Sequence, residues 1–313
     1  MKNRLIGIFC LLALLLASSG CVADEEPATR PTSQEILGIY LHDAAVYAAD
    51  VGKDAALAEF GRLDGEFTSG SWYVYAYDTE CNLLAHPYEP QSVGLDRLGW
   101  TDSRGMPVIR IARDVAAAGG GYIVYLYPEP VDGVIDEAAV ETYKPKLGYV
   151  LPAGDGWWIG SGVALENSDG TYPPAIQEMI ELVHGGVSYA QAQGKVAAIA
   201  ELSDLNGQFV DSDGHYLYAY LYDGTLIGHP YLPEKIGSNL INREDQYGMR
   251  MIAALAETAE DGGGFVVFIW PNPDEGNRDE LKIGYVMPVD DEWWLGSGVY
   301  LSEVTGEYTR LTV

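Results

Sequence analysis

The sequence has few basic residues. Its 313 residues include 18 lysines and arginines against 46 aspartates and glutamates, which gives a formal net charge of −28. A field of this sign repels nucleic acids and anionic lipid headgroups, so neither is expected as a partner surface. The acidic excess is consistent with solubility in a salty or extracellular medium. It does not by itself identify a cationic ligand.

Cysteine is also scarce, with three residues in the whole chain. Cys10 and Cys21 lie near the N-terminus, which leaves Cys81 without a partner for an internal disulfide. Cys81 follows a predicted strand, and we interpret it as a turn or strand-end residue rather than a nucleophile.

The sequence lacks the motifs of the common enzyme classes. No serine is flanked as in a nucleophile elbow, and no Cys-His pair occurs in both halves of the chain. The five histidines are scattered, so no metal site is expected. The segment 211–214 contains two aspartates but lacks the closing glutamate of an EF-hand, and we interpret it as a turn. We therefore expect no enzyme activity and no cofactor.

The N-terminus has the pattern of a secretory signal. Lys2 and Arg4 precede an apolar run over residues 5–17, which is too short for a confident membrane span. Small residues then lead to Cys21, a pattern similar to lipoprotein signals, and Cys21 is the predicted lipidation site. We assign residues 1–20 to the signal peptide and 21–33 to a tether. The alternative is an uncleaved N-terminal anchor. Both place the mature protein in an extracytoplasmic location, anchored to the cell membrane.

The rest of the chain is a tandem duplication. His86-Pro87 corresponds to His229-Pro230, and Trp157-Trp158 corresponds to Trp293-Trp294. The offset falls from 143 to 136 residues between these pairs, which places a seven-residue insertion between Glu129 and Pro145 of the first copy. The period is too long for a solenoid, where units run to about 50 residues. We expect two domains, over residues 34–170 and 171–313.

Each copy follows the same predicted order of elements. A long amphipathic helix comes first, over residues 34–60 or 175–202, with a Gly-Lys interruption. Two strands follow, and every second residue of the first is tyrosine, which is the period of a strand. A short helix ends at a glycine triplet, and three more strands complete the copy. The fold class is α+β: each domain has a long N-terminal helix packed on a mostly antiparallel five-stranded sheet.

The order of motifs resembles that of the Cache family. More narrowly, each copy is similar to the single Cache domain of type 2, so we expect the chain to have two such domains. The resemblance extends over residues 34–301 and rests on the His-Pro pairs, the glycine triplets, Lys146 to Val150, the run Trp270-Pro271-Asn272-Pro273 and the two Trp-Trp strands. It implies two PAS-like domains that recognise a small molecule outside the cell. The first copy has Tyr127-Pro128-Glu129-Pro130 in place of the Trp-Pro-Asn-Pro run. Its pocket therefore either differs from the second or is closed.

Aromatic and polar residues of both copies form the predicted ligand site. In the second copy they are Tyr218, Tyr220, His229, Phe268, Trp270 and Lys282, and in the first Tyr75, Tyr77, His86, Tyr125, Tyr127 and Lys146. The alternatives are ordinary packing for the tyrosines, a hydrogen bond that pins the His-Pro loop for the histidines, and a solvated strand end for the lysines. In each Trp-Trp pair, at most one ring can face the pocket.

Three functions remain open from the sequence, of which the first is the prediction and the other two are alternatives. The first is an anchored sensory protein that binds an organic acid, amine or amino acid, lacks its own signalling output and works with a separate membrane receptor or kinase. The second is a solute-binding lipoprotein of a transport system. The third is a structural surface protein without a ligand. We expect the second copy to hold the active pocket.

Overall fold

The computed structural model describes residues 33–128, 135–139, 142–211 and 214–311. The predicted signal and the predicted tether up to residue 32 lie outside the described residues, as does part of the segment with the predicted insertion. Ser33, predicted as the end of the tether, is the first residue of α2. In the first half the elements are α2 (Ser33–Val51), α3 (Lys53–Phe60), β1 (Thr68–Ser69), β2 (Trp72–Tyr73), β3 (Tyr75–Asp78), β4 (Leu83–Ala85), η1 (Pro90–Ser92), α4 (Val108–Ala117), β5 (Gly121–Pro128), β6 (Tyr143–Gly154) and β7 (Trp157–Ala164). In the second half they are α5 (Pro174–Gln193), α6 (Lys195–Leu202), β8 (Tyr218–Leu221), β9 (Leu226–Gly228), η3 (Pro233–Lys235), α7 (Met251–Glu260), β10 (Gly264–Asn272), η4 (Pro273–Glu275), β11 (Arg278–Pro288), β12 (Trp293–Tyr300) and α8 (Leu301–Thr305). Within these described parts, no helix combines the length and apolarity that crossing a membrane requires.

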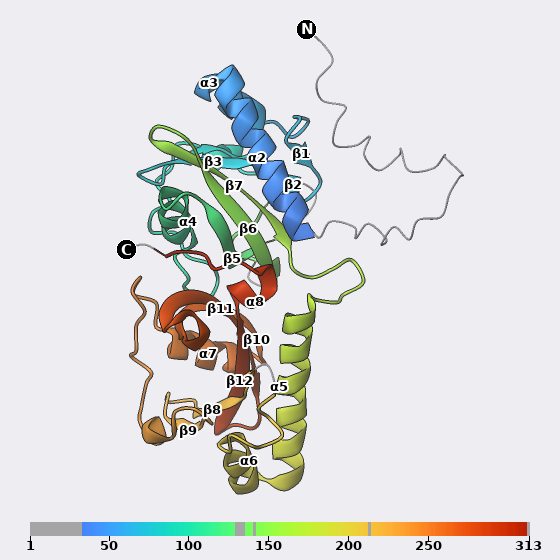
Figure 1. The fold of residues 1–313 in the computed structure, drawn as a ribbon, viewed down its shortest axis with the longest axis vertical. Coiled ribbons are helices and arrows are strands. Elements are labelled where there is room, and N and C mark those ends of the chain that lie inside the picture. The colour runs from blue at the N-terminus through green and yellow to red at the C-terminus, as the bar shows by residue number, and fades with distance from the viewer. Residues whose placement is uncertain (1–32, 129–134, 140–141, 212–213, 312–313) are drawn as a thin grey trace, which may run out of the picture. The chain divides into compact units, whose positions relative to one another are not determined.

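Each half contains one five-stranded antiparallel sheet (Figure 1). The strand orders are β4-β3-β7-β6-β5 and β9-β8-β12-β11-β10, so the two sheets have the same topology. The prediction of an α+β fold with two such sheets is confirmed. The central β7 and β12 are the Trp-Trp strands, which explains why these segments are almost wholly apolar.

The long helix of each half breaks at its glycine. Gly52 and Gly194 have φ values of 84° and 82°, in the left-handed region that favours glycine. The predicted helix 34–60 is therefore two helices, α2 and α3, and the second copy has α5 and α6 in the same places.

The two faces of each sheet carry different residues. Val74 and Ala76 belong to a core cluster with α2 and Trp157, whereas Tyr75 and Tyr77 belong to the cluster that contains α4. Trp158 lies on the tyrosine face, with its ring stacked on that of Tyr77 at 4.9 Å between centroids. This confirms that the tyrosines face away from the long helix and that the two tryptophans point to opposite faces.

The predicted tyrosine strands are shorter than the sequence suggested. Val74 separates β2 from β3, and β8 begins at Tyr218 rather than Tyr216. Tyr216 forms an isolated bridge with Val210, and its carbonyl accepts a hydrogen bond from the Ser297 hydroxyl at 2.8 Å. Its backbone therefore bonds outside the β8 ladder.

The glycines of the Trp-Trp strands let aromatic rings lie close to the sheet. A Cβ atom added to Gly160 would lie 2.4 Å from the Tyr75 ring, and one added to Gly296 would lie 3.1 Å from the Tyr218 ring. The glycines at 160 and 296 thus allow the site tyrosines to pack against the backbone.

Cys81 has a φ of 70° at the position where the second copy has Gly224, as expected for a turn residue.

We expect Gly160→Ala to lower the free energy of unfolding by about 1–3 kcal/mol, because overpacking forces the buried Tyr75 ring to move. Thermal or urea unfolding of the full chain measures this. Gly185→Ala is the matched control: Gly185 is an exposed residue within α5 with nothing near its added Cβ. Alanine there should be neutral or stabilise the protein by up to about 1 kcal/mol. Equal effects of the two substitutions would contradict the close-approach explanation.

Candidate functional site

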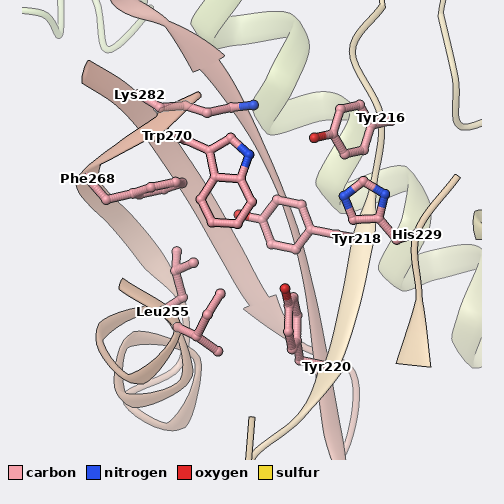
Figure 2. A pocket seen from close by; sticks show the side chains of 9 residues that line it. Tyr216, Tyr218, Tyr220, His229, Leu255, Phe268, Trp270 and Lys282 are labelled. Atoms are coloured by element: carbon pink, nitrogen blue, oxygen red, sulfur yellow. The ribbon is translucent and has the colours of Figure 1, made fainter. Parts of the chain in front are cut away.

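Residues of three strands (β8, β10 and β11), of the segment just before β8, of the His-Pro loop and of α7 surround a pocket in the second half. Its lining residues are Tyr216, Tyr218, Tyr220, His229, Ile252, Leu255, Phe268, Trp270 and Lys282. Lys282 and His229 approach the same space from opposite sides, and Phe268, Trp270 and Leu255 form further walls (Figure 2). All six residues predicted for the second copy are therefore brought together around one pocket.

The pocket is small and largely apolar. It measures about 20 Å³ for the centre of a water-sized sphere. A single water needs about 10–15 Å³ on that measure, so the space suits a ligand of few atoms. Because the walls are hydrophobic, only a few polar groups could orient a bound molecule, as is usual for small-ligand sites.

Lys282 is the charged group of the pocket. It lies in the middle of β11, opposite Phe268 of β10 and Tyr300 of β12, and its side chain is only 4% exposed. Its ammonium lies 4.2 Å from the ring centroid of Tyr300 and 5.4 Å from that of Tyr216. Among the described residues, no hydrogen bond or ion pair of this ammonium is present. The cation–π contacts with these two rings offset only part of the free-energy cost of burying the charge.

Burial lowers the pKa of Lys282 from 10.5 to about 8, and the charges of Glu303 and Glu280 oppose that shift. Both carboxylates have other partners. Glu280 accepts hydrogen bonds from the Asn272 amide and the Ser302 backbone N–H, each at 2.7 Å. Among the described residues, neither carboxylate lies within ion-pair distance of the Lys282 ammonium.

Glu303 is held by His215, a residue that the sequence analysis missed. The ring nitrogens of His215 lie 2.8 Å from an Asp211 carboxylate oxygen and 2.9 Å from one of Glu303. These hydrogen bonds raise the pKa of His215 to about 9, and the bond to Glu303 has the larger effect on that pKa. Glu303 also accepts the backbone N–H of Tyr300 at 3.2 Å. Nothing in the spacing of these residues indicated that they meet, because 88 residues separate His215 from Glu303.

His229 has a defined tautomer. Its Nδ1 accepts the backbone N–H groups of Tyr231 at 3.0 Å and Leu232 at 3.2 Å. Burial, with a smaller effect of Lys282, lowers the pKa of the ring to about 4, so at neutral pH the single ring proton is on Nε2. That nitrogen points into the pocket (Figure 2). His229 thus pins its loop, as the alternative interpretation held, and also lines the pocket.

Trp270 lines the pocket and is stacked with a cation. The guanidinium of Arg243 lies 3.9 Å from the centroid of the Trp270 ring. Arg243 is exposed, and Trp270 is partly exposed. This places a positive charge beside the pocket of a chain whose overall charge is strongly negative. Arg243, Tyr216, Ile252 and Leu255 were not among the predicted site residues.

The first half brings its predicted residues together in a different arrangement. Lys146 is 1% exposed and lies opposite Tyr125 in the ladder, which matches Lys282 opposite Phe268. The Nδ1 of His86 accepts the backbone N–H groups of Tyr88 and Glu89, both at 3.1 Å. Burial, together with the charges of Lys146 and Arg97, lowers the pKa of His86 to about 3. The hydroxyl of Tyr127 donates a hydrogen bond to Glu89, a buried residue that the sequence analysis did not select.

The described residues contain no group of three or more His, Cys, Asp or Glu side chains that could hold a metal ion.

Comparison with known proteins identifies the repeated unit. The family model described as Single Cache domain 2 matches residues 62–171 and again 175–312. The sensor histidine kinase MctS of Rhizobium johnstonii is 36% identical over 114 residues, which are 36% of this chain and 23% of that protein. The chain thus spans less than a quarter of the length of this curated relative.

Two solved structures show similarity at low superposition scores. A methyl-accepting chemotaxis protein from Vibrio parahaemolyticus is 27% identical, with a TM-score of 0.36, over 42% of this chain and 90% of its own. The ligand-binding domain of the Pseudomonas fluorescens chemoreceptor CtaA, solved with L-alanine, is 13% identical, with a TM-score of 0.25, over 85% and 89%.

We expect Lys282→Met to raise the free energy of unfolding at pH 7 by about 1–3 kcal/mol, because it removes a buried charge and keeps the chain length. The lysine pKa is lower in the folded state than the unfolded value of about 10.4. The loss of stability caused by burying the charged lysine is therefore fully present below pH 8, and it decreases as the pH rises towards 10.4.

Thermal unfolding of both proteins between pH 6 and 10.5, in buffers without carboxylates, measures this difference. The His215 interaction is present in both proteins, so its titration cancels. A difference that does not change with pH would mean that methionine packing, not the buried charge, is responsible.

Proposed function

Because the chain belongs to the Single Cache domain 2 family through both of its halves, we propose that its second domain binds a small organic carboxylate outside the cell. Single Cache domains are extracytoplasmic modules that sense small molecules, and the curated relative is a sensor histidine kinase. The observation that carries the choice of ligand is the buried Lys282 ammonium, which faces the pocket and has no carboxylate within ion-pair distance among the described residues.

The other groups of the pocket fit the same ligand. The Nε2–H of His229 supplies a hydrogen-bond donor opposite the ammonium, so one carboxylate can meet a charge and a donor together. Leu255, Phe268 and Trp270 suit a short hydrocarbon tail. The nine lining residues include no acid that would hold the ammonium of an amine or amino acid. The pocket therefore favours a small monocarboxylate over the other two ligand classes.

We expect titration calorimetry at pH 7 to show binding of acetate, propionate or butyrate and no binding of methylamine. Lys282→Met should weaken carboxylate binding by about 30-fold or more, because loss of one partner of a buried charge pair costs at least about 2 kcal/mol. Affinity in the unaltered protein should fall as the pH rises above about 8, since Lys282 then loses its proton.

Lys235→Met is the control, because Lys235 is an exposed lysine of the same domain. It should leave the affinity unchanged. Tight binding of methylamine, or unchanged carboxylate affinity in Lys282→Met, would refute the proposed ligand class.

The membrane anchor belongs to the same proposal. The signal pattern before Cys21 supports a lipid-modified N-terminus that holds the two domains at the outer surface of the membrane. There they would act with the separate receptor or kinase expected from the sequence. The domain boundaries 34–170 and 171–313 remain part of this proposal.

We expect the chain expressed in a bacterial host to incorporate labelled fatty acid and to sediment with membranes. Cys21→Ser should abolish the label, because it removes the thiol that carries the lipid. Cys81→Ser should retain it, because Cys81 is buried inside the first domain. Labelling that persists in Cys21→Ser, or that is absent from the unaltered protein, would exclude lipidation at this position.

A further inference from the structure

The first domain contains a buried carboxylate where the second has an apolar residue. Glu89 is the third residue after His86, and Leu232 is the third residue after His229. The two lie at the same point of the fold, directly before η1 and η3, and have identical backbone angles of φ −126° and ψ 51°. Glu89 is 4% exposed. The duplicated backbone thus carries different chemistry at one position.

The carboxylate of Glu89 is surrounded by donors and cations. It accepts the hydroxyl hydrogen of Tyr127, and one of its oxygens lies 3.7 Å from Nε2 of His86. The other oxygen lies 3.8 Å from a guanidinium nitrogen of Arg97, which also pairs with Glu137. Because Nδ1 of His86 accepts two backbone N–H groups, the proton of this neutral ring is on Nε2, the nitrogen nearest to Glu89.

Lys146 belongs to the same cluster. Its ammonium lies 5.3 Å from the ring centroid of Tyr127, whose hydroxyl binds Glu89, and 5.7 Å from that of Tyr73. The second domain turns the equivalent lysine and histidine towards its pocket and has no acid at the position of Glu89. The lysine and the histidine are therefore present in both domains, and among the described residues only the first domain has a carboxylate at this position of the loop.

We propose that Glu89 takes the place of the ligand carboxylate in the first domain, which is therefore held in a ligand-bound-like state and binds no free carboxylate. This inference rests on the proposed function of the second domain. Glu89 is then the residue that separates a self-occupied domain from a ligand-binding one. Shortening its side chain should create a second site for a small carboxylate anion.

The test uses the full chain with Lys282→Met, which removes the site of the second domain, and adds Glu89→Ala. Formate and acetate are the probes, and chloride at equal ionic strength is the control. We expect Lys282→Met alone to bind neither probe, and the double variant to bind one equivalent. The melting temperature of the double variant should rise by about 2–5 °C with saturating acetate and not with chloride.

Glu89→Gln in the same background is the matched control, because the amide fills the space and should prevent binding. A double variant that folds and binds no carboxylate, or equal binding by the Ala and Gln variants, would overturn the inference. If Glu89→Ala does not fold, Leu232→Glu in the otherwise unaltered chain decides the question. It should abolish carboxylate binding by the second domain, and retained binding would overturn the inference.

The two proposals fail in different ways. If the unaltered chain binds no carboxylate, or if Lys282→Met binds as the unaltered chain does, the proposed function is wrong. If Lys282→Met loses binding and Glu89→Ala does not create a site, only the role of Glu89 is wrong.

Discussion

The site of each domain depends on one imidazole held by two backbone N–H groups. In His86 and His229 alike, Nδ1 accepts both bonds from the loop that follows the His-Pro pair. These bonds favour the neutral ring and leave the proton on Nε2, which points into the pocket in the second domain and lies 3.7 Å from a Glu89 oxygen in the first. They also fix the path of the loop, so the third residue after the histidine occupies the same place in both domains. One side chain thus pins the loop through Nδ1 and keeps a donor, the Nε2–H group, on its other edge.

The second constraint is the cost of burying an ammonium. Lys146 and Lys282 lie in the middle of the fourth strand of their sheets and are almost fully buried. Such a charge needs an anion or strong dipoles nearby, because transfer out of water is expensive. The first domain has Glu89 in this environment, within reach of His86 and Arg97. The second domain has aromatic faces around Lys282 and commits Glu280 and Glu303 to other partners. Among the described residues Lys282 has no ion-pair partner, and the proposed carboxylate site rests on this observation.

The strongly acidic chain has a buried cation, Lys282, in its second domain. The net charge of −28 is a property of the whole surface and is screened by salt over about 10 Å. Lys282 lines the pocket, and Arg243 lies against the Trp270 ring beside it. The two copies then differ at a few side chains, such as Glu89 and Leu232, on the same backbone. The proposed difference in ligand binding between the two domains rests on such a change, which leaves the backbone angles at this position unaltered.

The sequence by itself determined the architecture. Alternation of tyrosine with small residues placed Tyr75 and Tyr77 on one face, and the pairing of the copies aligned Lys146 with Lys282 across a seven-residue insertion. These features are local or periodic, so they can be read from one chain. Contacts between residues far apart in sequence were decided only by the tertiary structure. The His215–Glu303 pair joins residues 88 positions apart. Glu89, in the loop before η1, accepts a hydrogen bond from Tyr127 of β5, 38 residues further along the chain. Whether a buried lysine has an internal partner depends on such contacts, because the burial of charge is a property of the packed core and not of any single segment.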